Sequence, residues 1–276
     1  MLQWKRCRMP RTRIGNIEMY YEVHGSGEPI VLIHGLSMDC STWFNQVSVF
    51  SQNYQVVVFD NRGVGQTDAP NEDYSTEMMA DDAVALLKFL NVDNAHILGF
   101  SMGGMIAQRI ALKYPEIVKS LLLNTTAAQF PAKAKHLVQT WLRMLNENVS
   151  LETRIREGFL WGYTNRFFED DERVTALVNR AIAHPHPLST HGFAGQVAAL
   201  MEHDTRSQIS QISVPTLVLI GGDDIFIPIE FSEELAAKIP KAELVVLERG
   251  GHNCWMEFPE PFNRAVMRFL EGVASK

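Results

Sequence analysis

Cysteine, basic charge and long apolar runs are all scarce in this sequence of 276 residues. Its three cysteines, Cys7, Cys40 and Cys254, are too few and too scattered for a disulfide framework or a CxxC metal site. A reduced, cytoplasmic environment is therefore expected. The formal net charge of −7 argues against nucleic acid as a partner, because binding phosphates requires a basic surface.

Membrane-spanning and secretory segments are missing as well. The longest apolar runs, residues 30–33 and 216–220, have the length of a strand, whereas a membrane-spanning helix needs about 18 apolar residues. The first 13 residues are basic but contain no apolar segment, so they do not form a secretory signal. No membrane partner is expected. Residues 1–9 are predicted to be a disordered leader, with Met9 an alternative to Met1 as the native start.

What the sequence contains is a regular alternation of strand-like and helix-like segments. Continuous runs rich in Val, Ile and Leu are typical of parallel strands buried on both faces. They occupy residues 29–33, 54–60, 94–100, 119–124, 216–222 and 243–248. Helical periodicity is found at residues 79–90, 102–114, 231–239 and 259–270. Residues 14–21, followed by residues 24–27, read as a leading strand and a hairpin turn. The pattern predicts an α/β fold with a mostly parallel central sheet flanked by helices.

The alternation is interrupted once, between residues 129 and 207, where only helical patterns and turns occur. An insertion of this size between two strands of a sheet is either a lid over a site or a second lobe. We therefore expect a core formed by residues 10–128 and 208–276, with residues 129–207 as a helical cap inserted before the late strands.

The strongest chemical signal is Gly99-Phe100-Ser101-Met102-Gly103, a G-x-S-x-G pattern between a predicted strand and a predicted helix. In this context the serine lies on a strained turn that exposes its hydroxyl group, and small neighbours are needed for the turn to form. The amides at the start of the following helix favour negative charge that develops there. Ser101 is the candidate nucleophile.

A serine hydroxyl needs a base and the base needs an orienting carboxylate. Of the nine histidines, His252 follows two glycines just after the last predicted strand, where a flexible loop can reach across the edge of the sheet. The carboxylate should follow one of the last strands, before the one that precedes the histidine. Two adjacent residues, Asp223 and Asp224, follow the predicted strand at residues 216–222. Because successive side chains diverge, only one of them can contact His252, while the other caps the turn or faces solvent.

The oxyanion formed during attack needs two backbone N–H donors. Met102, directly after the serine, supplies one, and Leu36 in the loop after the first parallel strand supplies the other. His34 at the end of that strand is expected to shape the loop rather than to act as a base. Four further residues are expected to contact the substrate: Gly35, Phe100, Trp141 and Ile225.

No cofactor or metal site is expected. The segment from Asp60 to Asp68 has a G-x-G pattern but lacks a third glycine and a following helix, so it is a weak nucleotide signal. A tight turn with an ion pair between Asp60 and Arg62 is the expectation there. No phosphate-binding motif and no metal-ligand spacing of histidines and carboxylates is present in the sequence.

With these motifs in this order, the sequence resembles the α/β-hydrolase superfamily from about residue 10 to its end. The motifs are His34-Gly35, Asp60-Asn61-Arg62-Gly63, Gly99-Phe100-Ser101-Met102-Gly103-Gly104, Gly222-Asp223-Asp224 with Pro228, and Gly251-His252. The pattern looks most like the 3-oxoadipate enol-lactonases and the related small esterases and cofactor-free haloperoxidases. In the family the acid usually precedes a proline by four residues, which implies Asp224. Serine at the elbow disfavours the dehalogenase and epoxide hydrolase branches.

The expected function is hydrolysis of a carboxylic ester or lactone of small to medium size, through an acyl-enzyme on Ser101. Within enzymes the alternatives are an enol-lactone hydrolase and a hydrolase of carbon–carbon bonds in aromatic degradation. The non-enzyme alternative is a receptor-like protein that keeps the fold and holds a ligand under the cap. The expected partner is a small molecule, and the sequence carries no signal for an oligomeric state.

Overall fold

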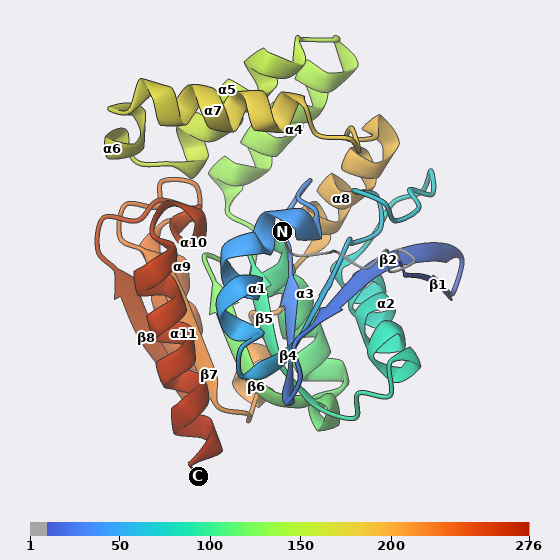
Figure 1. Cartoon of the computed structure of the whole chain (residues 1–276), viewed down its shortest axis with the longest axis vertical. Helices are drawn as coiled ribbons and strands as arrows, with labels where there is room; N and C mark the ends of the chain where they lie inside the picture. Colours follow the sequence, from blue (N-terminus) through green and yellow to red (C-terminus); the bar gives the residue numbers. More distant parts are fainter. Residues whose placement is uncertain (1–9, 276) are drawn as a thin grey trace, which may run out of the picture.

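The computed structural model describes residues 10–275, so the expected disordered leader, residues 1–9, lies outside the described residues. The centre of the molecule is an eight-stranded sheet with strand order β1-β2-β4-β3-β5-β6-β7-β8 (Figure 1). The strands are β1 (Arg11–Ile14), β2 (Ile17–His24), β3 (Glu28–Ile33), β4 (Tyr54–Phe59), β5 (Ala95–Phe100), β6 (Val118–Asn124), β7 (Thr216–Gly221) and β8 (Ala242–Leu247). From β4 to β8 all neighbouring strands are parallel. The mostly parallel sheet expected from the sequence is confirmed.

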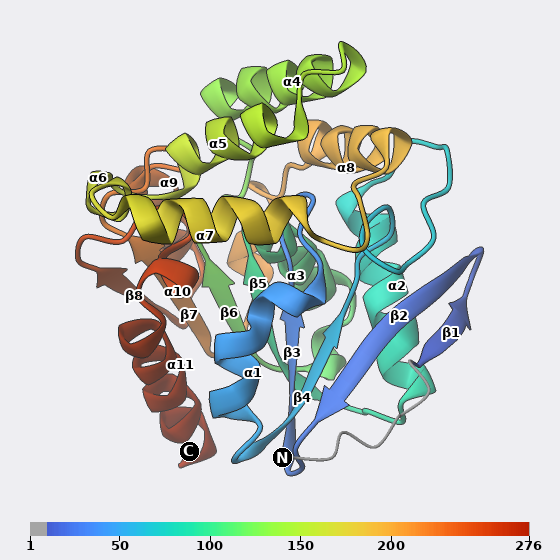
Figure 2. The same cartoon turned by 45° about the horizontal axis from the view of Figure 1, so that its top comes forward.

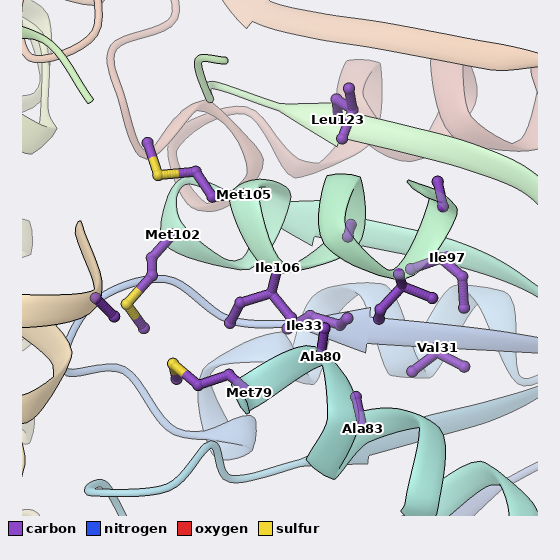
Figure 3. Close-up of a cluster of buried hydrophobic side chains, with 14 of the residues drawn as sticks. Val31, Ile33, Met79, Ala80, Ala83, Ile97, Met102, Met105, Ile106 and Leu123 are labelled. Carbon is purple, nitrogen blue, oxygen red and sulfur yellow. The ribbon is translucent and has the colours of Figure 1, made fainter. Parts of the chain in front are cut away.

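Helices cover both faces of the sheet. One face packs against α1 (Phe44–Phe50) and α11 (Pro259–Ala274), and the other against α2 (Thr76–Phe89), α3 (Met102–Lys113) and α9 (Ile229–Lys238). Figure 3 shows how Met79 and Ala80 of α2 meet Ile106 of α3 over Ile33 of β3. These four side chains are at most 1% exposed. Burial on both faces explains why the central strands are continuous apolar runs rather than alternating ones.

The prediction of a single strand over residues 14–21 was wrong. The chain instead forms an antiparallel hairpin in which Ile14 of β1 pairs with Ile17 of β2. Gly15 takes a φ of +54° in the turn, a conformation that glycine adopts without strain. Residues 24–27 do not close a hairpin either, because β2 pairs with β4 and not with the following strand β3.

The last strand also departs from expectation. β8 lies at the edge of the sheet, and its side chains are mostly half-buried, with Val246 40% exposed. Its apolar run therefore marked a strand correctly but not burial on both faces.

Between β6 and β7 the described chain forms no strand, only loops, a short 3₁₀ helix at Ile209–Gln211 and five α-helices. They are α4 (Ala132–Asn146), α5 (Leu151–Gly162), α6 (Asn165–Phe168), α7 (Asp171–Ile182) and α8 (Thr190–Glu202). We call residues 129–207 the cap. Gln129 and Asp204 form an isolated antiparallel bridge, so the two ends of the cap lie side by side. Figure 2 shows the cap helices above the end of the sheet toward which the parallel strands point. No helix in residues 10–275 is long and apolar enough to cross a membrane.

Candidate active site

Ser101 lies between the end of β5 and the start of α3, with φ +54° and ψ −117°. This backbone conformation is strained for a residue with a side chain. The two glycines of the motif make it possible. A Cβ atom at Gly99 would lie 2.2 Å from the carbonyl oxygen of Gly103, and one at Gly103 would lie 2.1 Å from that of Ile33. The close crossing of strand and helix thus requires glycine at both positions and holds the serine at the tip of the turn.

The structure brings Ser101, His252 and Asp224 together in one hydrogen-bonded row. Nε2 of His252 is 3.1 Å from Oγ of Ser101, and Nδ1 is 2.8 Å from Oδ2 of Asp224. The three residues come from the loops after β5, β8 and β7, and their exposed fractions are 4%, 7% and 6%. With the proton on Nδ1, His252 donates to Asp224 and its Nε2 accepts from the Ser101 hydroxyl, the arrangement that a general base requires.

Asp224, and not Asp223, contacts the histidine. The second carboxylate oxygen of Asp224 accepts hydrogen bonds from the amides of Phe226 (2.8 Å) and Ile227 (2.9 Å). Both oxygens of Asp224 are thus occupied, which fixes the plane of the carboxylate toward His252. Asp223 is an exposed residue whose amide donates to the carbonyl of Gly250, the solvent-facing alternative that the sequence had left open.

The two expected oxyanion donors flank the serine. In residues 10–275 neither the amide of Leu36 nor that of Met102 donates to a protein acceptor, so both are available. Gly35 carries Leu36 close to the nucleophile, since a Cβ atom at Gly35 would lie 3.1 Å from Cβ of Ser101. Met102 begins the 12-residue helix α3, whose N-terminal end favours negative charge.

His34 supports this loop from behind. It is fully buried, its ring stacks on Trp43 at 4.2 Å between centroids, and its Nε2 lies 2.7 Å from Oγ1 of Thr42. Burial lowers the pKa of His34 well below the ordinary histidine value, so the ring is neutral. Its carbonyl oxygen accepts a hydrogen bond from the side chain of Asn61 (3.0 Å). His34 therefore orders the loop that carries Leu36 and does not reach Ser101 as a base.

The expected ion pair between Asp60 and Arg62 is absent from the described structure. Asp60 accepts instead from the amides of Cys40 and Gln66, both at 2.8 Å. Arg62 turns toward α2 and binds Asp82 through two hydrogen bonds of 2.6 and 2.9 Å. Arg62 also contacts Glu72 at 3.2 Å. Its two partners lie 10 and 20 residues away along the chain and could not be identified from local spacing.

A cavity of about 480 Å³ opens over Ser101. Ser101, Phe100 and His252 line it from the core, and Trp141, Phe159 and Trp161 line it from the cap. Of the four residues predicted to contact substrate, Phe100 and Trp141 line this cavity, whereas Gly35 and Ile225 do not. Ile225 is 51% exposed. The next residue, Phe226, faces the cavity in its place.

The wall residues missed in the sequence had only partial signals. Phe159 and Trp161 belong to an aromatic-rich stretch of the cap, which fits a pocket wall and a cap core equally well. Phe226 lies in the loop after β7, next to Ile225. Only the conformation of this turn determines that Phe226, and not Ile225, faces the cavity.

Glu257 joins the cap to the loop that carries the catalytic histidine. This carboxylate is 5% exposed and accepts hydrogen bonds from the amides of Gly251 and Thr164, both at 3.4 Å, and from the hydroxyl of Thr164. Gly251 precedes His252, and Thr164 lies between α5 and α6 of the cap. The amide of Asn253 also donates to the carbonyl of Gly162 at 2.8 Å. Nothing in the sequence pattern singled out Glu257.

Two contacts cross from the cap to the core along the wall of the cavity. Nε2 of His184 is 3.0 Å from a carboxylate oxygen of Asp39, and the guanidinium of Arg180 lies 4.7 Å from the ring centroid of Phe44. All four residues line the cavity. Among residues 10–275 no group of three or more His, Cys, Asp or Glu side chains is placed to hold a metal ion.

Comparison with known proteins identifies the family and the fold of this chain. Residues 28–259 match the family described as the alpha/beta hydrolase fold. A relative from Serratia proteamaculans is named RutD, a provisionally assigned carbamate hydrolase. It is 30% identical to this chain over 262 residues, which cover 91% of this chain and 96% of the relative. The crystal structure of the enol-lactonase from Burkholderia xenovorans superimposes with a TM-score of 0.85 at 26% identity, covering 95% of this chain and 100% of that one. A thermophilic esterase from Thermogutta terrifontis gives a TM-score of 0.84 at 28% identity, covering 98% and 99%.

Proposed function

From the premise that this chain belongs to the α/β-hydrolase fold family and is a hydrolase, we propose that it cleaves a carboxylic ester or lactone through an acyl-enzyme on Ser101. The observation that carries the proposal is the row of Ser101 Oγ, His252 Nε2 and Nδ1, and Asp224 Oδ2, joined by distances of 3.1 and 2.8 Å. A serine hydroxyl with a base in reach, and a base with an orienting carboxylate, is the arrangement of an activated nucleophile.

The reaction proceeds in two acyl-transfer steps. His252 takes the proton from Ser101 as Oγ attacks the carbonyl carbon, and the amides of Leu36 and Met102 hold the negative oxygen. The imidazolium then gives this proton to the leaving alkoxide, which departs as the alcohol. A water molecule loses a proton to His252 and attacks the acyl-enzyme, and the carboxylic acid is released as the proton returns to Ser101. Asp224 stabilises the imidazolium in both steps.

Two relatives support neighbouring substrate classes. The likeness to an enol-lactonase structure favours lactone opening, in which the leaving alkoxide or enolate stays attached to the acyl group. The likeness to RutD favours a carbamate, whose carbonyl carbon accepts the same attack. Both reactions would use Ser101 and the same two amides, but the lactone would leave an acyl group on Ser101 with the alcohol still attached, whereas the carbamate would leave a carbamoyl group and release its leaving group.

A fluorophosphonate probe tests the nucleophile directly. The probe should label the wild-type protein once, with the added mass on the peptide that contains Ser101. Labelling should be slow after heat denaturation, because the activated serine exists only in the fold. A panel of p-nitrophenyl esters, an enol-lactone and a carbamate then ranks the substrate classes by kcat/KM. A folded wild-type protein that neither reacts with the probe nor hydrolyses any of these compounds would favour the receptor-like alternative, in which the cavity only binds.

A further inference from the structure

Two indole rings from different helices of the cap share one carboxylate. Glu157 of α5 accepts a hydrogen bond from Nε1 of Trp141 on α4 through Oε2, and another from Nε1 of Trp161 on α5 through Oε1, at 2.9 Å. An ionised carboxylate is an acceptor only, and here each of its two oxygens receives one indole donor. Charge-assisted hydrogen bonds of this kind are stronger than neutral ones.

Both indole rings form the wall of the cavity, whereas Glu157 lies behind them. Trp141 and Trp161 line the cavity over Ser101, and Glu157 is not among the lining residues. Lys133 covers Trp161, with Nζ 4.8 Å from the ring centroid. Glu157 therefore has no route to the reacting atoms, and its effect on a substrate must act through the tryptophans.

The wall continues to the catalytic residues without a gap. Trp141 stacks on Phe226, with 5.6 Å between ring centroids and an angle of 25°. Phe226 in turn meets the imidazole of His252 edge-on at 4.7 Å, and its amide donates to Asp224. A substrate group that extends from Ser101 toward the cap must pack against these rings. Their positions decide which groups fit.

We infer that Glu157 is a positioning residue that sets substrate specificity, by fixing the indoles of Trp141 and Trp161 as a rigid wall for an apolar group of the substrate. The inference rests on the proposed function, because it concerns the pocket of the same reaction. Two long side chains held in single rotamers lose little further entropy when a substrate binds. Without the carboxylate, both indole N–H groups lose their acceptor and the rings become free to turn.

The test compares three variants with a control on the same helix. Glu157→Gln keeps the shape but offers only one acceptor oxygen, Trp161→Phe removes one donor, and the double variant combines them. Glu152→Gln is the control, since Glu152 is an exposed residue of α5 that pairs with Arg156 at 2.8 Å. Each variant is measured for kcat and KM on p-nitrophenyl acetate, butanoate and hexanoate, and for its rate of fluorophosphonate labelling.

Glu157→Gln should raise KM for butanoate about tenfold and flatten the preference among the three esters, because loss of a charge-assisted bond loosens the wall. Its kcat and labelling rate should change less than about threefold, since the catalytic atoms are untouched. In the double variant the single amide oxygen of the substituted side chain serves Trp141 alone, so the pair should cost no more than Trp161→Phe by itself. Glu152→Gln should match the wild type.

Two results would overturn the inference. One is that Glu157→Gln leaves KM for the three esters and the preference among them unchanged. The other is that Glu157→Gln lowers kcat equally for all three esters and lowers the labelling rate as well, which would show a general structural role. If the wild-type protein itself neither reacts with the probe nor turns over esters, the proposed function fails instead. The failure of the inference and the failure of the function are therefore distinguishable.

Discussion

The sheet core and the cap meet at one cavity but are held together by different contacts. In the core, apolar side chains fill both faces of the sheet, and strand residues such as Leu32 and Ile97 are fully buried. The cap's own cluster contains four buried residues, Tyr163, Phe167, Val174 and Val178. Large apolar side chains of the cap such as Leu160 (58%) remain exposed. The cap helices α4 and α8 extend the main apolar core through residues such as Val138 and Leu200, whereas the outer helices α5 to α7 rely on this small cluster together with polar and aromatic contacts.

This difference separates two kinds of change. Ser101 and Asp224 stand on loops anchored by buried strands, so their substitution should alter the chemical step while the fold persists. The cap contributes side chains that line the cavity and contacts that connect it to the core. Changes in the cap should therefore alter which substrates enter the cavity and how tightly they bind. The predictions below test this division.

The largest effect is expected for Ser101→Ala. Among residues 10–275 its hydroxyl is the only cavity group with a hydrogen bond to Nε2 of His252, and loss of a nucleophile of this kind lowers kcat by on the order of 10⁶. Stability should change little, because alanine at position 101 leaves the packing of Gly99 and Gly103 intact. Steady-state hydrolysis of p-nitrophenyl butanoate and thermal unfolding measure the two quantities. A folded variant that retains a tenth of the wild-type kcat would refute the assignment.

The next effect distinguishes the paired aspartates. Asp224→Asn should lower kcat by about 10⁴, since an amide at this position stabilises the wrong tautomer of the histidine and not the imidazolium. Asp223→Asn is the matched control and should cost less than about tenfold, because its side chain is exposed. Both variants are measured with the same ester. If Asp223→Asn were the more damaging change, the geometry around His252 would be misassigned.

A smaller effect concerns the joint between cap and core. His203 at the end of α8 is 1% exposed, and its Nδ1 lies 2.9 Å from Oγ1 of Thr76 on α2. Burial, aided by the charge of Arg109, lowers the pKa of His203 from 6.5 to about 3. Between these two pKa values the unfolded chain binds a proton at His203 and the folded chain does not. The contribution of neutral His203 to the free energy of unfolding is therefore fully present above pH 6.5 and is lost as the pH falls from 6.5 toward 3.

For His203 alone this loss reaches about 1.4 kcal/mol per pH unit. His203→Gln, which keeps a partner for Thr76 but does not titrate, should unfold in urea with a weaker pH dependence between pH 6.5 and 5. His34 is buried and neutral in the same way, so part of the dependence should remain in the variant. Equal slopes in variant and wild type would mean that His203 is protonated in the folded protein.

The same division explains what the sequence could predict. The strands β3 and β5 are read from continuous apolar runs, and the elbow at Ser101 from two glycines whose Cβ atoms would collide with backbone oxygens. Both are local consequences of residue type. Contacts between distant segments were not readable where no motif marked them: Arg62 binds Asp82, and Glu157 joins Trp141 to Trp161. The sequence also could not show which of the neighbours Ile225 and Phe226 faces the cavity, because this depends on the turn in which Asp224 accepts the amide of Phe226.

The smallest expected effect tests whether the cap closes the cavity. If the cap restricts access to the cavity of about 480 Å³, acetate to hexanoate esters should be hydrolysed faster than dodecanoate, with no jump in rate at the micellar threshold of the substrate. The contact between His184 and Asp39, at 3.0 Å, joins the cap to the core along the wall of this cavity. His184→Ala removes this contact and should therefore raise the ratio of kcat/KM for dodecanoate to that for butanoate by a few-fold, since a partly exposed polar contact is worth about 1 kcal/mol or less. His191→Ala is the control, because His191 is exposed and does not line the cavity. Because His184 does not contact Ser101, its loss should leave the hydrolysis of acetate unchanged.

If dodecanoate is already the better substrate of the wild-type protein, the cap does not act as a closed lid, and the contrast between a fixed core and a selecting cap fails at this point.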